Sequence, residues 1–91
     1  MKKQIWKFEI APIDVAIQMP KGAEILTIQT QDGIPCIWAL VYPENEKEKR
    51  YFEVYGTGQE IYYDMGTNRK YINTFQCESG TLVFHLFERI D

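Results

Sequence analysis

The sequence is poor in the residues that bind metals. It has one histidine and two cysteines among 91 residues, and it contains no Cys-x-x-Cys pair. A closed zinc site takes about four nitrogen or sulfur ligands, so these side chains predict no metal site, and no cofactor motif is present. Cys36 and Cys77 each fall within an apolar stretch. We therefore expect two buried free thiols rather than a disulfide.

The sequence also lacks an excess of positive charge and a long apolar run. Its formal net charge is −3, which disfavours binding to duplex nucleic acid. No apolar stretch approaches the ~20 residues that span a bilayer, and polar residues interrupt any apolar leader after the basic residues Lys2 and Lys3. We expect a soluble intracellular protein, in the cytoplasm of a host cell, with no membrane partner.

Most familiar catalytic motifs are missing. There is no Gly-x-Ser-x-Gly elbow, and the glycine-rich turn 56–58 lacks the third glycine and the following helix of a dinucleotide fingerprint. His85 lies in an apolar stretch, which is typical of a half-buried structural histidine. Glu53 and Glu88 are expected to solvate exposed sheet faces. The sequence therefore predicts a protein without enzymatic activity, with a small hydrolase that uses His85 as the least favoured alternative.

Alternation of apolar and polar residues is the main pattern that is present. Its period of two predicts strands rather than helices. Asp32-Gly33 is typical of a type I′ hairpin turn. We expect one all-β domain over residues 1–91, a small antiparallel sandwich or partly open barrel of six to seven strands. The expected strands are Gln4–Ile10, Asp14–Met19, Glu24–Gln31, Ile34–Tyr42, Tyr51–Tyr55, Tyr71–Glu78 and Thr81–Ile90.

Three further expectations concern how these strands assemble. The first two strands are joined by a short connection and are predicted to form a hairpin. Pro43–Arg50 has no apolar side chain and is predicted to be a solvated loop or a short frayed helix. Cys36–Val41 and Leu82–Phe87 are apolar on both faces, so each is expected to be central or doubly covered. A second copy of the chain is one way to cover them, and we expect a homo-oligomer.

The long irregular segment 56–70 and its flanks contain the candidate binding residues. They combine aromatic faces that can stack on a base, a glycine backbone that can approach a phosphate, and two adjacent cations. The alternative interpretation is structural: tyrosines are common in strands, and two adjacent cations also keep a surface loop soluble. The candidate ligand-binding residues are Tyr55, Gly56, Thr57, Gly58, Tyr62, Tyr63, Asn68, Arg69, Lys70 and Tyr71.

Several stretches resemble small proteins of unassigned activity that occur in phage and prophage genomes. The likeness spans nearly the whole chain and rests on QIWKFEI, MPKGAEILTIQTQDGIPCIWALVYPENEKE, FEVYGTG and YINTFQ followed by LVFHLFE. The resemblance carries over no catalytic residue. It implies an accessory role in which small phage proteins counter host defence.

Two functions from different classes follow. The first is a non-enzymatic, oligomeric binding protein that sequesters a small phosphorylated, nucleotide-type signalling molecule, with the tyrosines on the base and Arg69, Lys70 and the 56–58 backbone on the phosphate. The alternative is a protein–protein inhibitor of a host factor, or a virion or assembly accessory protein, that docks through a sheet edge or an aromatic face.

Overall fold

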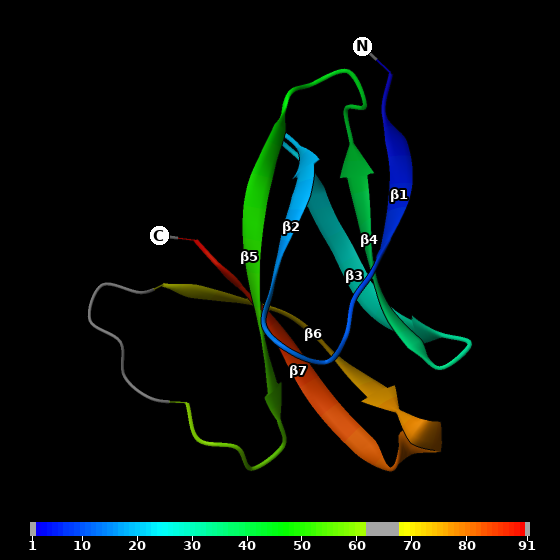
Figure 1. The fold of residues 1–91 in the computed structure, drawn as a ribbon, viewed down its shortest axis with the longest axis vertical. Helices are drawn as coiled ribbons and strands as arrows, with labels where there is room; N and C mark the ends of the chain where they lie inside the picture. Colours follow the sequence, from blue (N-terminus) through cyan, green and yellow to red (C-terminus); the bar gives the residue numbers. More distant parts are fainter. Residues whose placement is uncertain (1, 62–67, 91) are drawn as a thin grey trace.

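Two antiparallel β-sheets make up the computed structural model, which describes residues 2–61 and 68–90 (Figure 1). The three-stranded sheet has the order β1 (Gln4–Glu9), β4 (Ile34–Val41), β3 (Glu24–Gln31). The four-stranded sheet has the order β2 (Val15–Pro20), β5 (Lys47–Gly56), β7 (Leu82–Arg89), β6 (Arg69–Cys77), and the short 3₁₀ turn η1 (Glu78–Gly80) joins β6 to β7. The all-β expectation is confirmed: the arrangement is sandwich-like, and the described strands do not close into a barrel.

The core lies between the inward faces of the two sheets. Ile28, Ile37 and Val41 come from the three-stranded sheet, and Phe52 and Leu86 come from the four-stranded sheet; all five are almost completely buried. Side chains also join the sheets where β3 lies against β6. Thr30 Oγ1 donates to the carbonyl oxygen of Gln76, and Asn73 Nδ2 donates to Thr27 Oγ1 at 3.2 Å.

The structure confirms several local expectations. Asp32 and Gly33 both have positive φ, 52° and 80°, as a type I′ turn requires. β3 has the predicted bounds. β4 and β7, the two strands that are apolar on both faces, are each flanked by a strand on either side. Both cysteines are free and buried.

β5 is the longest strand and changes partner along its length. Its first part, Lys47–Phe52, pairs with β2, and its last part, Tyr51–Gly56, pairs with β7. In Figure 1, β2 accordingly runs beside the upper part of β5, whereas β7 and β6 cross its lower part. Within β5, only Tyr51 and Phe52 have a strand partner on both sides.

The predicted hairpin of the first two strands is wrong. β1 pairs with β4, and β2 pairs with β5 in the other sheet. The chain crosses between the sheets at residues 10–14, where Ile10 N–H donates to the Pro35 carbonyl oxygen and the Asp14 carboxylate accepts from Val54 N–H. Alternation identifies each strand but not its partner, since pairing is decided by contacts far apart in the sequence.

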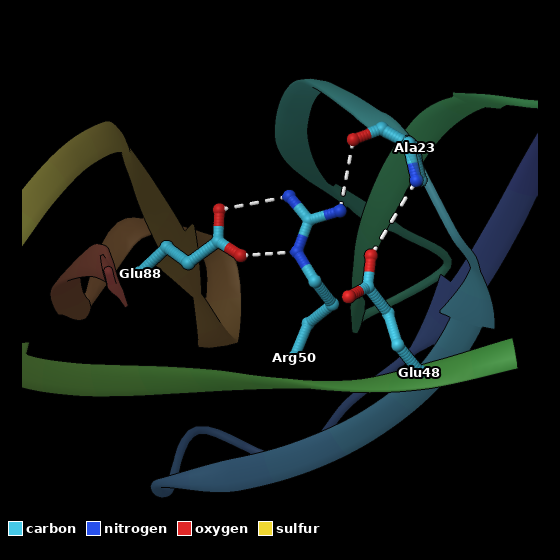
Figure 2. A network of polar contacts seen from close by, with 5 residues as sticks. Ala23, Glu48, Arg50 and Glu88 are labelled. Carbon is cyan, nitrogen blue, oxygen red and sulfur yellow. Dashed lines mark hydrogen bonds and ion pairs between the residues drawn. The ribbon is translucent and has the colours of Figure 1, made fainter. Parts of the chain in front are cut away.

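The expectation of a loop or frayed helix over Pro43–Arg50 is also wrong in its last four residues. Lys47–Arg50 begin β5 and pair with β2. Two of the charged side chains of this part reach the turn between β2 and β3, as Figure 2 shows: Glu48 Oε2 accepts from Gly22 N–H at 3.4 Å, and Arg50 Nη1 donates to the Ala23 carbonyl oxygen at 2.8 Å. Lys47–Arg50 has no apolar side chain, so these hydrogen bonds take the place of apolar contacts in this part of β5.

Glu88 and Glu53 correct a further expectation. Each is only 7% exposed, although both were expected to be solvated. Glu88 receives two hydrogen bonds from Arg50, one of them from Nη2 to Oε1 at 3.0 Å (Figure 2). The hydrogen bonds that Arg50 donates to the Glu88 carboxylate raise the pKa of Arg50 above its usual value, against the opposing effect of burial. A buried carboxylate is tolerated here because it is paired and hydrogen-bonded.

Candidate functional site

The outward face of the four-stranded sheet gathers most of the predicted binding residues. Successive side chains of a strand point to opposite faces, so Phe52, Val54 and Leu86 face the core, and Glu53, Tyr55, His85 and Phe87 face outward. The register places Tyr55 directly opposite His85 and Glu53 opposite Phe87.

A β-bulge in β6 adds two more side chains to this face. The register shifts by one residue between Tyr71 and Asn73, so that Tyr71 lies opposite Phe87 and Thr74 lies opposite His85. Residues three apart in a regular strand would point to opposite faces, and the extra residue of a bulge removes this alternation. Consequently the hydroxyl oxygens of Tyr71 and Thr74 are only 2.6 Å apart.

A cleft of about 220 Å³ opens on this face, between the sheet and the segment that follows β5. Its aromatic walls are in edge contact: ring centroids are 5.8 Å apart for Tyr55 and Phe87 and 5.5 Å apart for Tyr71 and Phe87. The residues that line the cleft are Tyr55, Gly56, Thr57, Gly58, Gln59, Ile61, Tyr71, His85 and Phe87.

The turn at the mouth of the cleft is held by its own hydrogen bonds. Gly56 N–H donates to Gln59 Oε1 at 2.9 Å, and Gln59 N–H donates to the Gly56 carbonyl oxygen at 3.0 Å. Gly58 has a φ of 86°, a conformation that favours glycine. Thr57 N–H donates to the Val83 carbonyl oxygen at 3.2 Å. This turn therefore presents the Thr57 side chain towards His85.

His85 is the centre of a chain of four hydrogen-bonding side chains. Its Nε2 lies 2.8 Å from Thr57 Oγ1, and its Nδ1 lies 2.9 Å from Thr74 Oγ1. Thr74 in turn contacts the Tyr71 hydroxyl. Both ring nitrogens therefore have a hydroxyl partner. His85 is half-buried, as the sequence predicted, but it also lines the cleft.

A cluster of charged side chains lies beside the cleft. The buried Glu53 carboxylate pairs with Arg69, approaches Arg89 Nε at 3.9 Å, and accepts from the Tyr55 hydroxyl at 3.2 Å. The hydrogen bond with Glu53 raises the pKa of Arg69 above its usual value. Burial, followed by the charge of Glu53, raises the pKa of Tyr55. Tyr55 is therefore a neutral donor at pH 7, fixed by Glu53.

The structure brings five predicted residues together around the cleft: Tyr55, Gly56, Thr57, Gly58 and Tyr71. The predicted pair of cations does not converge there. Arg69 is engaged by Glu53, and Lys70, the next residue of β6, lies opposite Glu88 on the alternate face. The Asn68 carbonyl accepts from Ile90 N–H at 3.0 Å. Tyr62 and Tyr63 lie outside the described residues.

Several residues of the site were not predicted as site residues: Glu53, Gln59, Ile61, Thr74, His85, Phe87 and Arg89. Alternation alone places His85 and Phe87 on one face of their strand. Their proximity to Tyr55 and Tyr71 depends on strand pairing, which no local signal in the sequence reports.

Residues 2–61 and 68–90 contain no helix with the length and hydropathy needed to cross a membrane. Within the same ranges no three His, Cys, Asp or Glu side chains are grouped so that they could hold a metal ion.

The fold and the cleft define a small all-β, sandwich-like protein with an aromatic-walled cleft on one sheet face. The chain belongs to the family described as a domain of unknown function, DUF7352, whose family model matches residues 1–91. No curated protein and no solved structure matches the chain.

Proposed function

We propose that this chain is a non-enzymatic binding protein that captures a small nucleotide-type ligand in the cleft beside β5, β6 and β7. The observation that carries the proposal is the composition of the cleft, in which the aromatic walls of Tyr55, Tyr71 and Phe87 meet hydrogen-bonding groups of Thr57 and His85. Stacking of a base on an aromatic side chain is worth ~1–3 kcal/mol, and a few polar groups orient the ligand.

The size of the cleft limits which part of a ligand enters it. About 220 Å³ is below the ~300–1,000 Å³ of sites for drug-sized molecules, so the cleft accommodates one ring system. The sugar and phosphate would remain outside. The Glu53 cluster, with Arg69 and Arg89, lies on the Tyr55 side of the cleft, and guanidinium groups bind phosphate through paired hydrogen bonds.

The resemblance to phage proteins provides a biological setting for this proposal. A small binding protein made in a host cell can lower the free concentration of a nucleotide signal by stoichiometric capture, without a catalytic step. We propose that the outcome is suppression of a host defence that depends on such a signal.

Calorimetry with a panel of cyclic and ADP-ribose-derived nucleotides tests the proposed function. Tyr71→Ala removes one wall of the cleft and is expected to weaken binding about tenfold or more, from the stacking energy above. Tyr51→Ala is the matched control, because Tyr51 is as exposed as Tyr71 (53% and 52%) on the same sheet face but does not line the cleft. Absence of heat with every nucleotide, or equal weakening by both substitutions, would overturn the proposal.

A second candidate function, docking to a protein, is favoured by the outward face of the three-stranded sheet. Two apolar side chains of this face are exposed, Ile5 at 61% and Ile34 at 42%. They share the face with the half-buried Trp38. Lys7 Nζ lies 5.8 Å from the centroid of the Trp38 ring. We propose a second copy of the chain as the partner, since isologous dimers are the commonest assemblies. Native mass spectrometry of the protein and of Ile5→Glu tests this: a dimer that becomes a monomer supports it. A wild-type monomer rules out self-association and leaves a host protein as the partner to seek.

A further inference from the structure

The chain of hydrogen bonds through His85 begins and ends at the same cleft. Its order is Thr57, His85, Thr74 and Tyr71, and both end residues, Thr57 and Tyr71, line the cleft. A ligand ring that contacts both Thr57 and Tyr71 would therefore meet the two ends of one connected chain, rather than two independent hydroxyl groups.

A neutral imidazole makes the two ends of this chain opposite in character. One ring nitrogen carries the hydrogen and donates, and the other accepts. If Nε2 donates to Thr57, then Nδ1 accepts from Thr74, Thr74 accepts from Tyr71, and the Thr57 hydrogen points to the ligand. Tyr71 then offers its oxygen to the ligand as an acceptor.

The other tautomer reverses every hydrogen bond and exchanges the two ends. Nδ1 then donates to Thr74, Thr74 donates to Tyr71, and Tyr71 donates to the ligand, while Thr57 accepts from it. In both tautomers one end donates and the other accepts. Hydrogen bonds that run in one direction also polarise one another and strengthen the chain.

One arrangement would break this rule. Thr74 could accept from both His85 and Tyr71, which would leave an acceptor at each end of the chain. The Thr74 hydroxyl hydrogen would then lack a partner among the described residues, where its oxygen is hydrogen-bonded to His85 and Tyr71. Leaving a part-buried donor unsatisfied is costly, so the directional chain is favoured.

We propose that the cleft selects rings that carry a hydrogen-bond donor beside an acceptor, as the Watson–Crick edge of a nucleobase does, and that the His85 chain reads this edge as a unit. The ligand class is thus a heterocycle with both groups on one edge. This inference rests on the proposed function, because it concerns the same cleft.

Matched nucleotides that differ by one methyl group test the inference. Uridine 5′-monophosphate has a donor at N3 beside the acceptor O4, and its N3-methyl derivative keeps the acceptor and loses the donor. Inosine 5′-monophosphate and its N1-methyl derivative form a second pair. Titrations at pH 8, where imidazole side chains are ordinarily neutral, are expected to show that methylation weakens binding about tenfold, as for one lost hydrogen bond.

The outcomes separate this inference from the proposed function. If none of the four nucleotides binds and no cyclic or ADP-ribose-derived nucleotide of the panel binds either, the proposed function fails as well. If a panel nucleotide binds and the four do not, only the inference is overturned. If both members of each pair bind equally, the cleft binds rings but does not read their edge, and only the inference is overturned.

Thr74→Val interrupts the chain at a residue that does not line the cleft. Without Thr74 the two end hydroxyl groups no longer hold fixed, opposite roles, so the tenfold preference for the unmethylated nucleotide is expected to fall several-fold. Tyr51→Phe is the matched control: it removes a tyrosine hydroxyl from the same sheet face at a residue that does not line the cleft, so the preference should persist. Loss of the preference in Tyr51→Phe, or its retention in Thr74→Val, would overturn the inference.

A spectroscopic readout covers the case in which Thr74→Val does not fold. The protein has a single histidine, so the ¹⁵N chemical shifts of one imidazole report its tautomer directly. Uridine 5′-monophosphate is expected to shift His85 towards one tautomer, and the N3-methyl derivative is not. Identical imidazole shifts with saturating amounts of both nucleotides would overturn the inference.

Discussion

Glu88 and Glu53 occupy neighbouring positions on opposite faces of one sheet, and their surroundings differ. Both are 7% exposed, and both pair with arginine. Glu88 lies on the core side, where Arg50 links it to the Ala23 carbonyl in the β2–β3 turn (Figure 2). Glu53 lies on the outward side and holds Tyr55, a wall of the cleft. The same type of ion pair therefore stabilises the fold on one face and shapes the candidate binding site on the other.

The largest expected effect is a loss of stability when the core-side ion pair of Arg50 and Glu88 is broken. Glu88→Ala leaves Arg50 charged and without its carboxylate partner. We expect this to lower the free energy of unfolding by about 3 kcal/mol. This value is the lower end of the range for buried pairs, because Arg50 is partly exposed. Urea denaturation measures this loss. Replacing both residues, as in Arg50→Met with Glu88→Leu, should recover most of it. If Glu88→Ala lowers the free energy of unfolding by less than about 1 kcal/mol, the Arg50–Glu88 pair does not stabilise the fold as a buried pair, since surface pairs contribute that little.

A smaller effect on stability, and a larger one on binding, is expected on the outward side. Glu53→Gln keeps an acceptor for Tyr55 and removes the negative charge beside Arg69 and Arg89, and its cost is about 1 kcal/mol. Because the arginines lose a competing anion, affinity for uridine 5′-monophosphate should rise several-fold at low salt, while affinity for uridine stays unchanged. Calorimetry with both compounds measures the difference. An equal change for both compounds would show that Glu53 does not act through the phosphate.

The smallest expected effect is a change of stability at high pH. The pKa of Tyr55 is raised in the folded protein relative to about 10 in the unfolded chain. Above pH ~10 the unfolded chain therefore holds fewer protons, and stability falls as the pH rises towards the pKa of the folded state. Thermal unfolding between pH 8 and 11 should show this fall in the wild type and a weaker one in Tyr55→Phe. Tyr51→Phe is the control, and a wild-type pH dependence in both variants would contradict the assignment to Tyr55.

The sequence predicts the elements of this fold better than their partners. Alternation locates the strands, and Asp32-Gly33 predicts its turn, because both are local properties of the backbone. The hairpin of β1 and β2 was predicted wrongly, because the crossing at residues 10–14 depends on contacts with Pro35 and Val54. Lys47–Arg50 was missed as strand because its polar side chains are satisfied by the distant turn at Ala23.

The sequence likewise predicts some residues of the candidate site and misses others. Tyr55, the 56–58 turn and Tyr71 stand out in the sequence because aromatic and glycine residues concentrate there. Thr74 and His85 do not, because their place beside the cleft depends on the bulge in β6 and on the register of β7. The burial of Glu53 depends on Arg69, an arginine of another strand. Such partners are known only when the sheet is assembled.

The change of partner along β5 has a mechanical consequence. β2 and the β6–β7 hairpin are attached to different parts of this strand, and they overlap only at Tyr51 and Phe52. Any bending of the hairpin against β2 would concentrate at this junction. Arg50 and Glu53 lie immediately on either side of it, and their ion pairs reach β7 and β6 on opposite faces. The two buried ion pairs therefore cross-link the strands next to this junction, one on each face of the sheet, and oppose such bending.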